Sequence, residues 1–190
     1  MTTVTVAGER VPGIDWNNLW WVAAILAAMT AAILLDEFWY LNFVHVLAGL
    51  LWTGIDLFMG FVIGPIMRTL SLEARRAMIV RLMPRMLFIM PTVSTVTTTS
   101  GWFLAEMRGH VEAPMSWWVI AALVIVTILT IQGLGILLPA NIRVYLQMRR
   151  ADPDMALVGR LMRRYVRVVA SQGVMQIAII VIMTRLVAGI

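Results

Sequence analysis

The chain has 190 residues, 61% of them hydrophobic and only 13% charged, with a formal net charge of +5. Soluble globular domains are nearer half apolar and a quarter charged, so this composition excludes a soluble domain and predicts an all-α bundle of membrane helices. The absence of cysteine excludes disulfides, thiolate metal sites, iron–sulfur clusters and covalently attached c-type haem.

Five apolar segments predict five membrane spans in a single transmembrane domain. The first fifteen residues lack the basic start, apolar stretch and cleavage site of a secretory signal, so we expect the first apolar segment to be retained. About 20 apolar residues cross the hydrocarbon core. The predicted spans are about 16–35, 40–67, 86–105, 117–139 and 168–187. The second is long enough to tilt or to bend near Gly64-Pro65.

Most arginines flank the same ends of these spans. They lie between spans two and three, between spans four and five, and at Arg10, whereas only Arg108 and Arg185 fall on the other side. The positive-inside rule then predicts a cytoplasmic N-terminus and an outer C-terminus for a multi-pass membrane protein. In a lipid-embedded chain the place of the arginines matters more than their sum, so the charge does not predict a nucleic-acid partner.

Two segments on the predicted inner side carry helical signals of their own. Residues 70–84 alternate arginine with apolar residues at roughly helical spacing, which predicts an amphipathic segment along the inner membrane surface. Asp152-Pro153-Asp154 combines an aspartate cap with a proline for the first turn, which is typical of a helix start. That helix could run without a break into the fifth span.

Span two carries the most informative side chains. His45, Trp52, Asp56 and Met59 follow at spacings of seven, four and three residues, so they share one helical stripe. His45 lies about 8 Å below the outer interface. Its imidazole could ligate haem iron or copper, or it could hydrogen-bond to a neighbouring helix. Asp56 lies about 16 Å deeper, where a carboxyl is either a proton or ion site or a protonated group bonded to a neighbour.

Glutamines on the later spans are candidate partners for this stripe. Gln132 lies in span four, and Gln172 and Gln176 lie four residues apart in span five. They could form the buried hydrogen bonds around Asp56 or bond a quinone carbonyl. Plain interhelical hydrogen bonding is the alternative.

Span three has seven hydroxyl side chains within nine residues. Hydroxyls can return hydrogen bonds to their own helix, so the span need not be polar outwardly. Thr92, Thr95 and Thr99 share a face that could line a hydrated path or contact a cofactor. Close helix packing through small residues is the alternative.

The outer side holds possible cofactor partners. Arg108 and Arg185 could pair with haem propionates, although Arg185 could equally extend to lipid headgroups. Met107, His110 and Met115 lie in the outer loop, and thioethers with imidazole suit copper(I).

The string HVLAGLLWTG at 45–54, followed by Gly64-Pro65 and Arg68, resembles the copper-resistance D membrane superfamily. It is similar to the haem-dependent J-type protoporphyrinogen oxidases, and it looks most like a related group of uncharacterised bacterial membrane proteins. The resemblance covers about residues 40–105.

This resemblance implies a small helical bundle in which His45 binds b-type haem, with Trp52 as a neighbouring motif residue. The chain has no lysine, whereas the oxidases rely on a lysine in a later helix, so protoporphyrinogen oxidation is not carried over. The fifth span also exceeds the four-helix pattern of the superfamily.

The leading hypothesis is a five-span bacterial inner-membrane protein that binds b-type haem through His45 and serves electron transfer or membrane redox chemistry, with a quinone or a redox protein as partner. Two alternatives stay open. One is a non-catalytic accessory or structural subunit of a larger membrane complex. The other is a copper-handling protein that uses His45 and His110. Whether the chain is an enzyme is also open.

Overall fold

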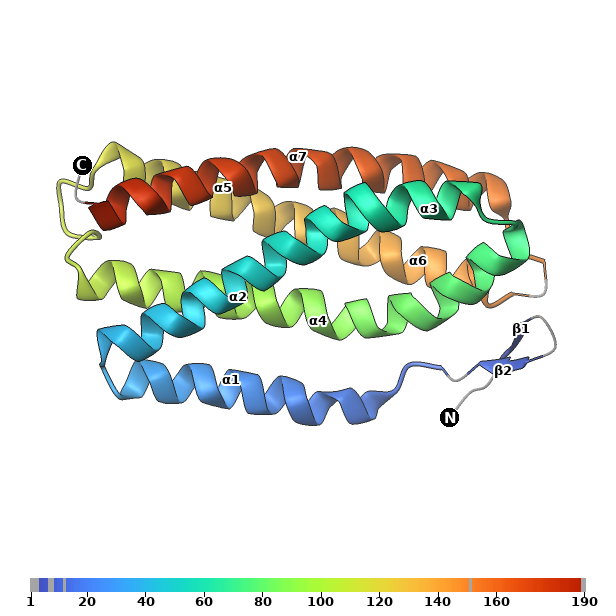
Figure 1. The fold of residues 1–190 in the computed structure, drawn as a ribbon, viewed down its shortest axis with the longest axis horizontal. Helices are drawn as coiled ribbons and strands as arrows, with labels where there is room; N and C mark the ends of the chain where they lie inside the picture. The colour runs from blue at the N-terminus through green and yellow to red at the C-terminus, as the bar shows by residue number, and fades with distance from the viewer. Residues whose placement is uncertain (1–3, 7–8, 12, 151, 189–190) are drawn as a thin grey trace.

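A computed structural model gives the fold, shown in Figure 1, and it describes all residues except 1–3, 7–8, 12, 151 and 189–190. A short antiparallel pair of strands precedes the helices. The elements are β1 (Val4–Val6), β2 (Glu9–Val11), the 3-10 turn η1 (Trp16–Asn18), α1 (Leu19–Leu34), α2 (Phe38–Phe58), the π-helical η2 (Met59–Ile63), α3 (Gly64–Thr69), α4 (Leu72–Met107), α5 (Trp117–Gln132), the π-helical η3 (Gly133–Leu137), α6 (Leu138–Met148) and α7 (Met155–Ala188).

The predicted all-α membrane bundle is confirmed, because five helical stretches are long and apolar enough to cross a membrane. They are Trp16–Leu34, Phe38–Thr69, Leu72–Met107, Trp117–Met148 and Met155–Ala188. Four of them have 32 to 36 residues. They are therefore about 48 to 54 Å long, against about 30 Å of hydrocarbon core. The sequence-based spans matched the apolar parts of these helices and left out their polar ends.

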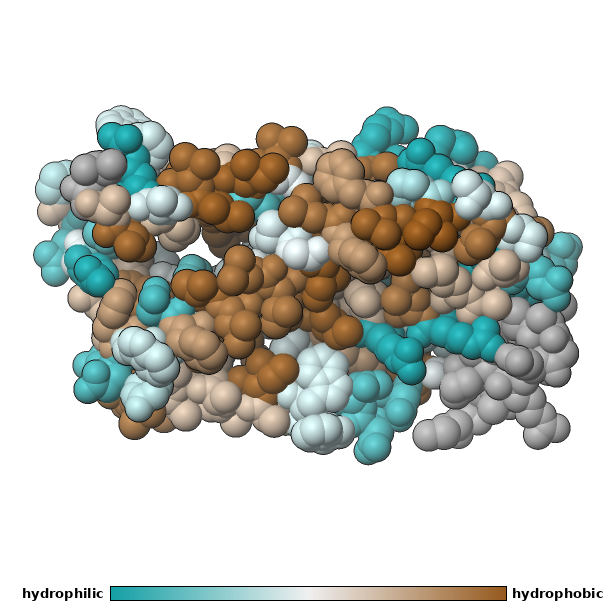
Figure 2. Space-filling model, viewed as in Figure 1, coloured by the Kyte–Doolittle hydropathy of each residue, from teal (hydrophilic) through white to brown (hydrophobic). Residues whose placement is uncertain are grey.

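The helices form two groups joined at one end. Helix α2 packs along α4, and α1 lies against both. Helix α5 packs on α7, while α6 contacts both α4 and α7 and so links the two groups. At the opposite end the α5–α7 pair stands apart from the α2–α4 pair (Figure 1). Figure 2 shows a hollow in the surface there, between α7 and α2.

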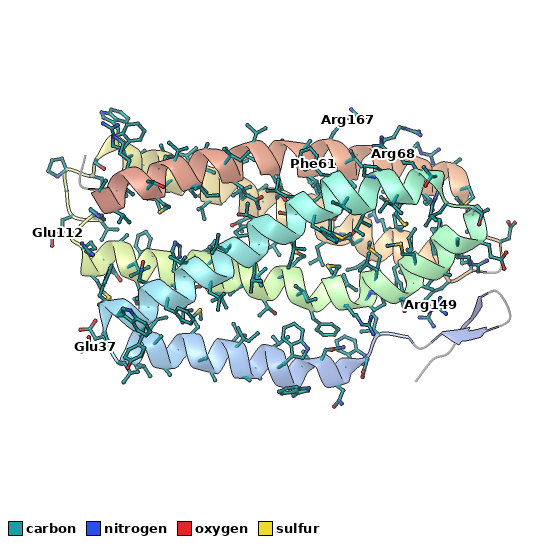
Figure 3. The ribbon with its side chains drawn as sticks, in the orientation of Figure 1. Glu37, Phe61, Arg68, Glu112, Arg149 and Arg167 are labelled. Atoms are coloured by element: carbon teal, nitrogen blue, oxygen red, sulfur yellow. The ribbon has the colours of Figure 1, made fainter. Side chains whose placement is uncertain are left out.

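The charged side chains divide between the two ends of the bundle. Figure 3 places Arg68 and Arg149 towards the end where the N-terminus lies, and Glu37 and Glu112 at the opposite end. The predicted orientation depends on this arrangement, because the positive-inside rule places the arginine-rich end of the helices on the cytoplasmic side. Below, the arginine-rich end is called the inner end and the other the outer end.

Two π-helical turns precede prolines inside the membrane helices. A proline lacks the N–H that an α-helix needs, and its ring clashes with the carbonyl four residues earlier. Just before Pro65, the Gly64 N–H bonds to the Met59 carbonyl, and just before Pro139, the Leu138 N–H bonds to the Gly133 carbonyl. Both bonds span five residues instead of four. The expected bend near Gly64-Pro65 thus coincides with a π-helical turn.

Residues 70–84 differ from the expectation of a separate amphipathic segment. From Leu72 onward they form the first turns of α4 and continue directly into span three, and three of their apolar side chains belong to a buried cluster shared with α6 and α7. That cluster comprises Ile79, Val80, Met83, Val144, Tyr145, Met148 and Val158. The arginines had suggested a surface position, but their apolar neighbours pack against α6 and α7, which keeps the segment in the bundle.

Helix α7 begins next to the predicted start and runs unbroken through span five, but Pro153 precedes the helix instead of lying in its first turn. The Asp154 side chain accepts a hydrogen bond of 2.8 Å from the Leu157 N–H, which caps the first turn. The helix then continues from Met155 to Ala188.

The Arg76 side chain fastens the start of α4 to the end of α6. Its guanidinium donates to the Met148 carbonyl at 2.7 Å and also to the Arg150 carbonyl. We expect Arg76→Met to lower the free energy of unfolding by about 2 kcal/mol, because charged hydrogen bonds to backbone are lost. Thermal unfolding of the detergent-purified chain measures this. Arg160→Met, at an exposed position of α7, is the matched control, and an equal loss in both variants would contradict the prediction.

Candidate functional site

His45 lies in the contact between α2 and α4. Its Nδ1 is 2.9 Å from the Thr97 carbonyl oxygen and 3.4 Å from the Ser100 hydroxyl. A carbonyl can only accept, so Nδ1 carries the hydrogen of this bond and a neutral ring keeps its lone pair on Nε2. The ring lies so close to Gly101 that a Cβ there would be 2.7 Å from Cε1. Glycine is therefore required for this approach of the imidazole to α4.

The Nε2 atom of His45 makes no hydrogen bond within the part of the chain that the structure describes. Trp52 and Asp56, seven and eleven residues further along α2, are buried inside the bundle. The shared spacing aims His45 to the same side of α2.

Asp56 is the centre of a second polar group. It is only 6% exposed, and its Oδ2 accepts a hydrogen bond of 2.8 Å from Gln176 Nε2 on α7. The Trp52 indole lies beside the same carboxyl, one turn earlier on α2. The structure thus brings together Trp52, Asp56 and Gln176 from the residues singled out by sequence.

A cavity of about 110 Å³ lies next to Asp56, between α2, α4, the α5–η3–α6 helix and α7. Asp56, Trp52, Asn141, Tyr165 and Gln172 contribute to its lining. Tyr165 faces Asn141 and lies within electrostatic range of Asp56. The cavity is therefore a polar space inside an otherwise apolar bundle.

The other sequence candidates lie apart from this cavity. Gln132 accepts a hydrogen bond of 3.4 Å from the Ser171 hydroxyl, so it joins α5 to α7 at an exposed position instead of contacting Asp56. Met59, at the start of the π-helical turn, lines an apolar groove between α2 and α4. The first three members of the predicted stripe face the interior, and Met59 does not share their surroundings.

Hydroxyls of α4 largely return to their own helix, as the sequence suggested. Thr92 donates to the Phe88 carbonyl at 2.7 Å and Thr98 to the Ser94 carbonyl at 2.9 Å. The cavity is lined by Ser94, Thr95 and Thr98. Of the face formed by Thr92, Thr95 and Thr99, only Thr95 lines this cavity.

Asn141 and Tyr165 were missed from sequence. Each lies in an arginine-bearing stretch that was assigned to the inner side, so neither looked like a membrane residue. A signal was nevertheless present: Tyr165, Gln172 and Gln176 have the same seven-and-four spacing as His45, Trp52 and Asp56. Two helices thus carry matching interior stripes.

At the outer end both candidate arginines lie over aromatic rings. The Arg108 guanidinium carbon is 4.0 Å from the Phe38 ring centre, and that of Arg185 is 4.7 Å from the Trp118 ring centre. His110 lies in the turn that follows α4. Among the described residues, no three His, Cys, Asp or Glu side chains are grouped to hold a metal ion.

The close contact of His45 with Gly101 predicts that a side chain at position 101 would destabilise the protein. Gly101→Ala forces the imidazole to move or to lose its bond to Thr97, so we expect the free energy of unfolding to fall by about 1–3 kcal/mol. Thermal unfolding in detergent measures the loss. Gly54→Ala is the control, because nothing lies within 4 Å of its added Cβ. His45→Ala should remove part of the Gly101→Ala effect, and strict additivity of the two changes would refute the contact.

Comparison of the chain with protein-family models, with curated proteins and with solved structures finds no match.

Proposed function

We propose that this multi-pass membrane protein binds b-type haem through His45 Nε2 and serves electron transfer or membrane redox chemistry in a bacterial inner membrane. The observation that carries the proposal is the hydrogen bond between His45 Nδ1 and the Thr97 carbonyl. Ligating histidines almost always donate their second ring nitrogen to such an acceptor, which fixes the tautomer and the ring orientation. The spare nitrogen of His45 is then the one suited to bind iron.

The surroundings of His45 support the use of Nε2 as an iron ligand. The Gly101 contact fixes the ring against α4, and the Thr97 carbonyl of the same helix holds Nδ1. Haem, when bound, would supply an iron that changes oxidation state by one electron. A quinone or a redox protein would be its exchange partner.

Arg108 and Arg185 fit the role of carboxylate partners. Both lie at the outer ends of their helices, α4 and α7, and both rest on aromatic rings that hold guanidinium groups without neutralising them. A guanidinium remains able to form a bidentate pair with a propionate. In this proposal the two arginines orient the cofactor and His45 ligates it.

The two histidines of the chain allow a matched test. After haem-replete expression, the purified protein should show a b-type reduced-minus-oxidised spectrum. His45→Ala should lose this spectrum, because the only intramembrane imidazole is removed, whereas His110→Ala in the outer turn should keep it. Stability of each variant in detergent is checked in parallel, so that loss of haem is separated from loss of fold.

Absence of haem from the wild type, or an unchanged spectrum in His45→Ala, would refute the proposal. Copper bound at about one ion per chain and lost in both histidine variants would then support the copper-handling alternative. If the protein binds neither haem nor copper and migrates as part of a larger particle on native electrophoresis, the accessory-subunit alternative would be supported.

A further inference from the structure

The carboxyl of Asp56 has no cationic partner in its cavity. The lining residues come from α2, α4, α5, η3, α6 and α7, and none of those described is Arg, Lys or His. Asp56 and Tyr165 are the only titratable groups among them. An unpaired carboxylate inside a membrane is costly, so this carboxyl needs a proton, waters or a bound cation.

The cavity has room for water beside Asp56. A buried water needs about 10–15 Å³ of such space and two to four polar partners. The volume of about 110 Å³ is enough for several waters. Asn141, Tyr165 and the hydroxyls of α4 supply partners around them.

Hydrogen-bonding capacity is also left over at the carboxyl itself. Gln176 donates to Oδ2 and the Trp52 indole lies beside the carboxyl, whereas an ionised carboxylate can accept about four hydrogen bonds. The Oε1 atom of Gln176, in a side chain that is 2% exposed, also has no partner among the described residues. A water, or a proton on the Asp56 carboxyl, would supply a donor in this group.

The cavity is closed towards the arginine-rich end. One turn beyond Asn141 on α6, Val144 and Tyr145 begin the buried apolar cluster that joins α4, α6 and α7. Exposed parts of the lining lie at Thr95 on α4, Thr130 on α5 and Leu134 on η3. The cavity therefore reaches the surface between α4 and the α5–η3 stretch, which have few contacts with each other.

From these contacts we propose that the cavity is a hydrated proton-binding site in which Asp56 takes up and releases a proton. In the uptake step a hydronium ion in the cavity gives its proton to the carboxylate, which leaves a neutral carboxylic acid and a water. Gln176 holds the carboxyl in place from α7 in both states, and the cavity waters carry the proton. This inference does not depend on haem binding at His45.

Infrared difference spectroscopy of the full chain in lipid tests the proposal. Spectra recorded between about pH 5 and about pH 9 should contain a pH-dependent carboxylic-acid C=O band that shifts in D₂O, because water reaches the site. Asp56→Asn should abolish this band. Asp36→Asn is the control, since Asp36 lies exposed in the α1–α2 turn, with a positive φ that asparagine tolerates.

A second pair of variants tests the role of Gln176. Gln176→Leu removes the hydrogen bond to the carboxyl and should move the band to higher wavenumber, whereas Gln132→Leu, at the glutamine bonded to Ser171, should leave it in place. The proposal fails if the Asp56 band is independent of pH or does not shift in D₂O. It also fails if sodium chloride removes the band at constant pH, which would identify a cation site.

Discussion

The lack of water in the hydrocarbon core governs this structure, because each backbone N–H and C=O must find its partner within the protein. Five long helices meet that demand along most of the chain. Where Pro65 and Pro139 remove a donor, the preceding turn widens and re-forms its bonds over five residues. The α4 hydroxyls return to their own carbonyls, and Gln172 donates to the Leu129 carbonyl from a buried position. Most polar groups inside the bundle are therefore satisfied within the protein, and His45 and Asp56 are two exceptions on α2.

Those exceptions lie on one side of α2 and differ in character. His45 near the outer end is fixed through one nitrogen and offers the other. Asp56 deeper in the bundle is held through one oxygen beside a polar cavity. Both use α4 as a common wall, with a backbone carbonyl near His45 and hydroxyl side chains near Asp56. A single helix pair thus builds a ligand-type site and a titratable site about 16 Å apart along α2.

Composition was sufficient to predict the bundle, because the length of each apolar segment can be read from the sequence without knowledge of the tertiary structure. Helical spacing was sufficient to place His45, Trp52 and Asp56 on one side of α2. It could not tell that Gln176 faces Asp56 while Gln132 faces Ser171, since that depends on how α5 and α7 rotate against each other. Asn141 and Tyr165 escaped because nearby arginines marked their stretches as lying outside the membrane, although the helices continue through them.

The two π-helical turns have a consequence for the angular phase of the helices. Such a turn contains about one residue more than an α-turn, so each helix leaves it rotated by about 100° relative to an uninterrupted α-helix. The phase of the outer half of α2 therefore does not carry over to α3, nor that of α5 to α6. Removing one residue from 59–63 would return the segment to α-helical pitch and turn the whole inner half, including Arg68, to a different side. Deleting or inserting one residue in this turn would therefore reorient more side chains than most substitutions could.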